Sequence, residues 1–131
     1  MQFAISVAVV VVILAALGFL VHGVVLRQDY RALGALYRPP ESQRTYMPLL
    51  LPAHIAAAIA LVWLYRNMRP SDSWLESGVR FGVAIAVLMT VHKFLVYYIT
   101  QPIPGSTATK QIVFDTITGI VIGMAIAFLN R

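Results

Sequence analysis

The sequence predicts an all-α protein: a membrane-embedded, antiparallel four-helix transmembrane bundle formed by a single integral membrane domain, residues 1–131. The first supporting observation is composition, because 60% of the 131 residues are hydrophobic and only 11% are charged. Soluble domains contain about 45–50% apolar and about 25% charged residues. The second observation is that the apolar residues form four long runs separated by short polar connections. The chain has no cysteine, which excludes disulfide scaffolds and thiolate metal sites.

The predicted spans cover about residues 3–26, 47–65, 74–100 and 107–130. At about 1.5 Å per residue, each of these helices is long enough to approach or exceed the ~30 Å hydrocarbon core of a bilayer. The first run starts without the basic residues of a signal peptide and exceeds the usual apolar core of about 7–15 residues. We therefore expect a first span that is retained.

Local sequence signals mark the boundaries of the helices. Ser73 followed by Glu76 fits a capping box, in which the serine side chain satisfies a backbone N–H group at the helix start. Residues 101–105 contain two prolines and a glycine, which predicts a turn between the last two spans. Ser106 is the expected N-cap of the last helix. Residues 28–38 fit either a short amphipathic helix in the membrane interface or a plain polar loop.

The ten Lys and Arg residues outnumber the five Asp and Glu residues, which gives a net charge of +5. The basic residues flank the apolar runs, which is typical of membrane edges and not of nucleic-acid binding. We expect membrane lipid as one partner, and other membrane subunits or a second copy of the chain as another. Aromatic residues near the span ends predict interfacial belts; these are Trp63, Tyr65, Trp74, Tyr97 and Tyr98. A quinone site beside Tyr97 is the alternative.

Ionisable residues inside the spans are the most informative feature, since a charged side chain costs roughly 2.5–3.5 kcal/mol at the centre of a membrane helix. Five ionisable residues are expected to lie inside the bilayer: His22, His54, His92, Lys93 and Asp115. When the chain is folded into four alternating spans, all five lie in the same half of the membrane, next to the first and third connections. We expect this half to be polar and the opposite half to be apolar.

Lys93 and Asp115 lie at nearly equal distances from the turn between the last two spans, which predicts that they reach the same depth. At about 100° per residue, Lys93 projects close to one series of small residues, and Asp115 begins another. The first series is Gly78, Gly82 and Ala86, and the second is Gly119, Gly123 and Ala127. We expect these series to form helix-packing seams and Lys93 to form a buried ion pair with Asp115 between the two helices.

Two interpretations of this predicted pair stay open. It is either a structural ion pair that sets the helix register or part of a proton or ion relay, a usual role of such groups in pumps and transporters. The histidines support a further hypothesis, because imidazoles on separate helices at similar depth can bind haem iron or another metal. His22 and His54, on either side of the first connection, would be the better axial pair. We predict no cofactor and keep haem as the alternative.

The sequence contains no GxSxG, HExxH, P-loop or paired-carboxylate motif. The leading hypothesis is therefore a multi-pass integral membrane protein without a catalytic site, which acts as an accessory or structural subunit or as a self-associating bundle. The small-residue series would serve internal packing or an outside partner. The alternatives are a small proton- or ion-coupled transporter and a haem- or quinone-binding redox subunit.

Several stretches of the chain resemble small uncharacterised bacterial inner-membrane proteins with four predicted spans. The stretches are GFLVHG at 18–23, LPAH at 51–54, RFG at 80–82, QPIPG at 101–105 and KQIVFDT at 110–116. The resemblance covers most of the chain and implies a four-span topology and a bacterial inner-membrane location, but no activity. Small multidrug transporters also have four spans. They depend on a glutamate in the first span, whereas the run 3–26 has no acidic residue.

Overall fold

The computed structural model describes residues 1–68 and 70–131, and this part of the chain contains helices and connections without a β-strand. The α-helices are α1 (Gln2–Gly18), α2 (Arg27–Ala32), α3 (Pro40–Tyr46), α4 (Leu50–Asn67), α5 (Trp74–Ile85), α6 (His92–Thr100) and α7 (Gly105–Leu129). The other helical elements are two π-helical segments, η1 (Phe19–Val25) and η4 (Ala86–Val91), and two 3-10 turns, η2 (Gly34–Leu36) and η3 (Met47–Leu49). The predicted all-α class is confirmed.

Four helical stretches are long and apolar enough to cross a membrane: Gln2–Val25, Pro40–Asn67, Trp74–Thr100 and Gly105–Leu129. They coincide closely with the predicted spans, and the chain has the features of a multi-pass membrane protein. The second stretch begins at Pro40 and not near residue 47, because proline fits the first helical turn, where its missing N–H is not needed. α7 begins at Gly105 after Pro104, so the prediction that Ser106 is its N-cap is wrong.

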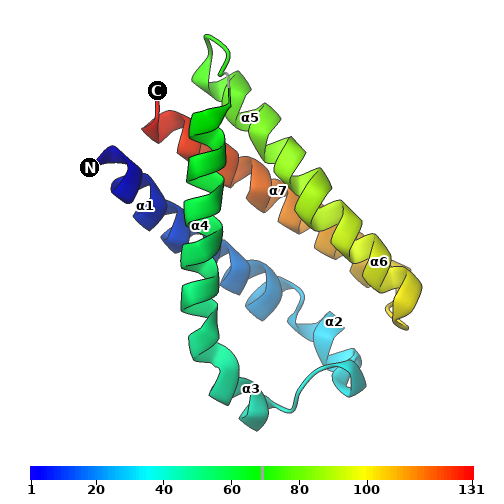
Figure 1. Ribbon diagram of the computed structural model, residues 1–131. Coiled ribbons are helices and arrows are strands. Elements are labelled where there is room, and N and C mark those ends of the chain that lie inside the picture. The colour runs from blue at the N-terminus through cyan, green and yellow to red at the C-terminus, as the bar shows by residue number, and fades with distance from the viewer. Residues whose placement is uncertain (69) are drawn as a thin grey trace.

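Figure 1 shows how the helices are arranged. α5, η4 and α6 form one long rod beside α7, and α1 also packs on α7. α4 crosses α1, and its first turns diverge from the other helices together with α3. Both termini lie at the same end of the molecule as the α4–α5 connection. The chain therefore runs from one end of the molecule to the other four times.

The closest helix contact joins α5 and its continuation to α7 through the two predicted small-residue series, which together we call the small-residue seam. A Cβ added to Gly82 would lie 2.5 Å from the Cα of Ile120 and 2.7 Å from the carbonyl oxygen of Gly119. A Cβ added to Gly78 would lie 2.7 Å from the Cα of Met124. Carbon atoms in contact are normally about 3.5–4.0 Å apart. Only glycine therefore permits this approach, as in other close contacts between membrane helices.

An apolar core fills the space between α1, α4, α5 and α7. Its residues are Val10, Ala58, Val62, Tyr65, Phe81, Ile122, Ile126 and Ala127. Tyr65 packs edge-on against Phe81, with ring centroids 5.3 Å apart. The prediction that Tyr65 belongs to an interfacial belt is therefore wrong, because its ring is part of the core. The other predicted belt residues, Trp63, Trp74, Tyr97 and Tyr98, are exposed.

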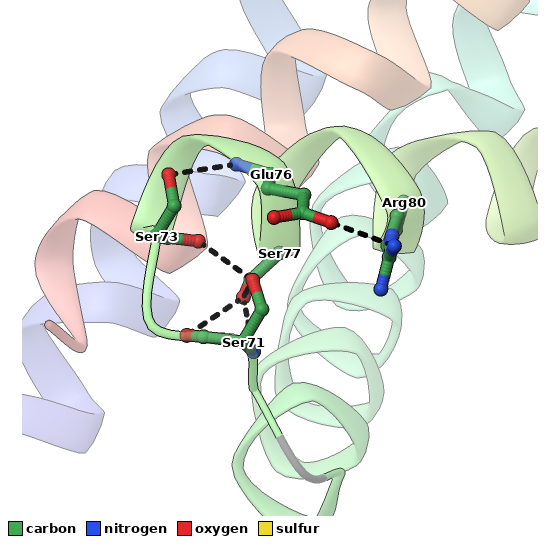
Figure 2. Close-up of polar contacts among 5 residues, drawn as sticks. All are labelled: Ser71, Ser73, Glu76, Ser77 and Arg80. Carbon is green, nitrogen blue, oxygen red and sulfur yellow. Dashed lines mark hydrogen bonds and ion pairs between the residues drawn. The ribbon is translucent and has the colours of Figure 1, made fainter.

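α5 begins with the capping interaction that the sequence predicts (Figure 2). The Ser73 hydroxyl accepts a hydrogen bond from the backbone N–H of Glu76 at 3.4 Å. The Glu76 carboxylate forms an ion pair with Arg80 at 2.6 Å, one turn later, instead of returning to Ser73 as in a complete capping box. The Ser77 hydroxyl accepts from the backbone N–H of Ser71 at 2.8 Å. This contact ties the preceding connection to the start of α5.

The connection after the first span is closer to a short helix than to a plain loop, the two interpretations of residues 28–38. It contains the short helix α2 followed by the 3-10 turn η2, and not one continuous amphipathic helix or a plain loop. Asp29 and Tyr30 of α2 are partly buried and form hydrogen bonds to side chains of α7. This segment therefore folds back onto the last span.

Candidate functional site

A change in the helical winding of the first span positions His22. Residues Phe19–Val25 are π-helical, and the backbone N–H of Leu26 donates to the carbonyl of Val21, five residues earlier, at 2.8 Å. Such i→i+5 turns are wider than α-helical turns and are frequent at functional sites. In this segment the His22 side chain reaches both α2 and α7.

His22 is the centre of a chain of hydrogen bonds between three elements. Its Nε2 atom lies 3.0 Å from Oδ1 of Asp115 on α7, and its Nδ1 atom lies 2.5 Å from the hydroxyl of Tyr30 on α2. The rings of His22 and Tyr30 are stacked, with centroids 5.8 Å apart. The amide nitrogen of Gln111 donates to the same hydroxyl at 3.1 Å. We call Asp115, His22, Tyr30 and Gln111 the polar chain.

The polar chain is shielded at both ends and more exposed in the middle. The Asp115 side chain is 15% exposed and the His22 side chain is 37% exposed. Gln111 is only 4% exposed, and its Oε1 atom has no hydrogen-bond partner in the part of the chain that the structure describes. A buried polar atom without a partner costs about 1–3 kcal/mol. Gln111 therefore holds an unused acceptor beside Tyr30.

The donors and acceptors of the polar chain define one consistent set of hydrogen bonds. An ionised Asp115 can only accept, so Nε2 of His22 carries the proton that faces it. In a neutral imidazole the Nδ1 atom is then an acceptor, and the Tyr30 hydroxyl donates to it. The Tyr30 oxygen accepts in turn from the amide of Gln111. The arrangement thus fits a neutral His22 beside a carboxylate.

A second set of polar contacts holds α2 against α7. Lys110 forms an ion pair with Asp29 at 2.9 Å, and the Thr107 hydroxyl donates to the same carboxylate at 3.3 Å. The hydrogen bond from Lys110 lowers the pKa of Asp29 below its ordinary value of 3.8. Burial raises the pKa of Tyr30 from 10.0 to about 12. The phenol of Tyr30 is therefore neutral at physiological pH and keeps a proton to donate.

The predicted ion pair between Lys93 and Asp115 does not form. Asp115 pairs with His22, whereas Lys93 is exposed and its ammonium lies 4.4 Å from the ring centroid of Phe94. The prediction extended the 100° step of an α-helix from the glycines of α5 to Lys93. Residues Ala86–Val91 are π-helical, and their wider turns advance by a smaller angle per residue. The helical phase therefore shifts, and Lys93 points away from the seam.

The three histidines do not form one cluster. His22 belongs to the polar chain, His54 is half-buried on α4, and His92 is exposed at the start of α6. Within residues 1–68 and 70–131, no group of three or more His, Cys, Asp or Glu side chains is placed to hold a metal ion. Both ring nitrogens of His22 are engaged, so axial ligation of haem by His22 and His54 would require the polar chain to break.

Sequence reasoning identified His22 and Asp115 but missed Tyr30 and Gln111. Gln111 precedes Asp115 by one helical turn, so both lie on the same face of α7. This spacing was an available signal for a polar face. Tyr30 lies beyond the end of the first span, and only the fold of α2 brings its hydroxyl back to His22. No sequence spacing indicates this contact.

No family model, curated protein or solved structure matches this chain. The resemblance to four-span bacterial inner-membrane proteins stays a prediction. The polar chain and its surroundings are therefore the basis for a functional proposal.

Proposed function

We propose that this multi-pass membrane protein lies in a bacterial inner membrane and acts as a small transporter that carries protons across it, with the polar chain as its proton-binding site. The observation that carries the proposal is the 3.0 Å contact of His22 with Asp115 between two apolar stretches. Ionisable residues inside membrane segments are typical of proton relays in pumps and transporters. Histidine is also the side chain that changes its charge near neutral pH.

Proton uptake by His22 would reverse the hydrogen bonds of the polar chain. An imidazolium donates from both nitrogens, so the Tyr30 hydroxyl becomes the acceptor of Nδ1 and needs a new acceptor for its own proton. The unused Oε1 atom of Gln111 supplies this acceptor after the side-chain amide rotates. The positive charge is then stabilised by the carboxylate of Asp115.

The apolar core confines this proton to one side in the conformation described. Val10 on α1 and Ile122 and Ile126 on α7 separate the polar chain from the polar contacts near the termini. There, Asn130 donates to the Ser6 hydroxyl at 3.1 Å, roughly 22 Å beyond Asp115 along α7 at a rise of about 1.5 Å per residue. Transport therefore requires a second conformation that opens the polar chain toward the termini.

Proton flux in proteoliposomes tests this proposal. With a pH-sensitive dye inside the vesicles and the membrane potential clamped by a potassium ionophore, the wild-type protein should collapse an imposed pH gradient several-fold faster than protein-free vesicles. Asp115→Asn and His22→Phe should abolish this acceleration. Lys93→Gln is the matched control, because it removes a charged group of a span that lies outside the polar chain. Equal rates for the wild type, Asp115→Asn and protein-free vesicles would contradict the proposal.

The exposed face of α4 favours a second candidate function, that of an accessory or self-associating membrane subunit. α4 packs mainly on α1, and Ala53, Ala56 and Ala60 are exposed at helical spacing. Small residues on such faces allow membrane helices to approach closely. Ala56→Cys should then give disulfide-linked dimers in native membranes, whereas Val87→Cys, also exposed but on η4, should not. Absence of such dimers, together with proton flux, would favour the transporter.

A further inference from the structure

The helix α2 contacts the polar chain without being part of the apolar core. None of the residues of α2 is buried, and the core residues come from α1, α4, α5 and α7. α2 begins directly after Leu26, whose side chain is fully buried, and the exposed turn η2 follows it. The chain is therefore anchored at Leu26, and α2 can move away from α7 without disturbing the core.

Contacts between polar side chains hold α2 against α7. The Asp29 carboxylate accepts from the Lys110 ammonium at 2.9 Å and from the Thr107 hydroxyl at 3.3 Å. We call these two contacts the latch. The Lys110 side chain is 49% exposed, and ion pairs at such positions are weak and screened by salt. The latch therefore opens at a smaller cost than any contact within the apolar core.

Tyr30 of α2 occupies the nitrogen of His22 that can take up a proton. The Nε2 atom carries the proton that faces Asp115, so the lone pair of the neutral ring is on Nδ1. The Tyr30 hydroxyl lies 2.5 Å from Nδ1 and donates to it. Among the described residues, Asp115 of α7 and Tyr30 of α2 are the titratable side chains in contact with His22. A proton therefore reaches Nδ1 either through Tyr30 or after Tyr30 has moved away.

Transfer through Tyr30 is disfavoured in the conformation described. The phenol oxygen already accepts from the amide of Gln111 at 3.1 Å, and Gln111 is only 4% exposed. Burial also raises the pKa of Tyr30 to about 12, so the phenol keeps its proton near neutral pH. Movement of α2 removes the hydroxyl from Nδ1 and releases the Gln111 amide in the same step. The geometry therefore favours direct proton uptake after α2 has moved.

We infer that α2 is a gate of the polar chain, whose opening withdraws Tyr30 from His22. The Nδ1 atom then takes up a proton from water at the end of the molecule that holds the α6–α7 connection (Figure 1). The inference rests on the proposed function, since it names the step that admits the proton. When α2 closes again, Nδ1–H donates to the Tyr30 oxygen, and the Tyr30 proton turns to the free Oε1 atom of Gln111 after amide rotation. Asp29 is a positioning residue, because it acts on His22 only through α2.

Carbethoxylation of histidine in the full chain, mapped by mass spectrometry, tests the gate. Diethylpyrocarbonate attacks the lone pair of a neutral imidazole, so the reaction rate of His22 measures how often Nδ1 is free. Asp29→Asn and Lys110→Met should each raise this rate about fivefold, the upper limit for loss of a partly exposed ion pair. Asp72→Asn is the matched control, because it removes an exposed carboxylate outside the latch. His54 should react at the same rate in every variant.

Two further variants separate opening of α2 from misfolding. Asp29→Lys combined with Lys110→Asp restores opposite charges and should return the rate at His22 towards that of the wild type. Tyr30→Phe removes the hydroxyl but keeps the latch, and it should also raise the rate at His22. The inference is overturned if Asp29→Asn and Lys110→Met react like the wild type, or if they raise the rates at His22 and His54 alike.

Proton flux distinguishes failure of the gate from failure of the proposed function. In the double variant Asp29→Cys with Lys110→Cys, a short bifunctional thiol reagent joins α2 to α7 and holds the gate closed. Flux in proteoliposomes should stop after cross-linking and return after reduction, whereas undiminished flux through the cross-linked protein would overturn the gate. If the wild type carries no protons, the proposed function fails, and the rates at His22 decide whether α2 opens.

Discussion

Asp115 lies within an apolar stretch and is contacted there by His22. The two side chains come from opposite ends of the sequence, and their 3.0 Å contact offsets part of the cost of placing a carboxylate in lipid. Tyr30 and Gln111 extend the contact, so that both ring nitrogens of His22 have partners, while Oε1 of Gln111 has none among the described residues. Lys93 has no part in this arrangement and lies over Phe94. The consequence is a specific pattern of energetic coupling.

Double-mutant cycles should show this pattern. We expect His22→Phe and Asp115→Asn to be coupled by about 0.5–3 kcal/mol in the free energy of unfolding, as is usual for side chains in direct contact. Lys93→Leu and Asp115→Asn should be additive within about 0.5 kcal/mol, because these side chains do not touch. Unfolding in mixed micelles, followed by circular dichroism, measures both values. A larger coupling for Lys93 than for His22 would restore the ion pair that the sequence suggests.

The phenol of Tyr30 predicts a loss of stability at alkaline pH. Its pKa is about 12 in the folded protein and 10.0 ordinarily. Below pH 10 both states keep the proton, whereas between pH 10 and pH 12 only the unfolded chain loses it, so stability falls as pH rises. The melting temperature in detergent should therefore decrease above pH 10. Tyr30→Phe should remove much of this decrease, and the exposed-residue control Tyr98→Phe should not.

At the scale of helices, the small-residue seam is the feature most sensitive to an increase in side-chain size. A Cβ added to Gly123 would lie 2.7 Å from the backbone nitrogen of Gly82, whereas a Cβ added to Gly18 would meet no atom within 4 Å. We expect Gly123→Ala to destabilise the protein by about 1–3 kcal/mol, as overpacked contacts do. Gly18→Ala should be neutral or slightly stabilising. The melting temperatures of both variants in the same detergent provide the comparison. Equal values would contradict the close packing of α5 and α7 at the small-residue seam.

Periodicity and local signals in the sequence predict much of the helix arrangement. The apolar runs predict the spans, Ser73 predicts the start of α5, and the spacing of glycines predicts which faces of α5 and α7 consist of small residues. The side-chain directions beyond η1 and η4 could not be predicted, because a π-helical segment changes the phase of every residue that follows. Lys93 was therefore placed on the wrong face. The contact of Tyr30 with His22 depends on the path of α2, which no periodicity describes.

At the scale of the whole molecule, the proposed four-span topology would place the α4–α5 connection and the α6–α7 connection on opposite sides of a membrane. Because the chain has no cysteine, single cysteines can be labelled without background. Asp72→Cys and Ser106→Cys, both at exposed positions, should react with an impermeant maleimide from opposite sides of sealed vesicles. Labelling of both positions from the same side would contradict the four-span topology.

The close backbone contact of α5 with α7 also determines which parts of the molecule can move. Two helices that leave no room for a methyl group cannot slide past each other without separating, so α5 and α7 form a rigid pair. α4 contacts mainly α1 and has few contacts with α7, so a movement of α4 relative to α5 and α7 breaks fewer contacts than a movement of α5 relative to α7. Spin labels at exposed Val83 and Val113 should therefore keep one distance at every pH, while labels at Trp63 and Val113 should report a second distance if the transport cycle operates.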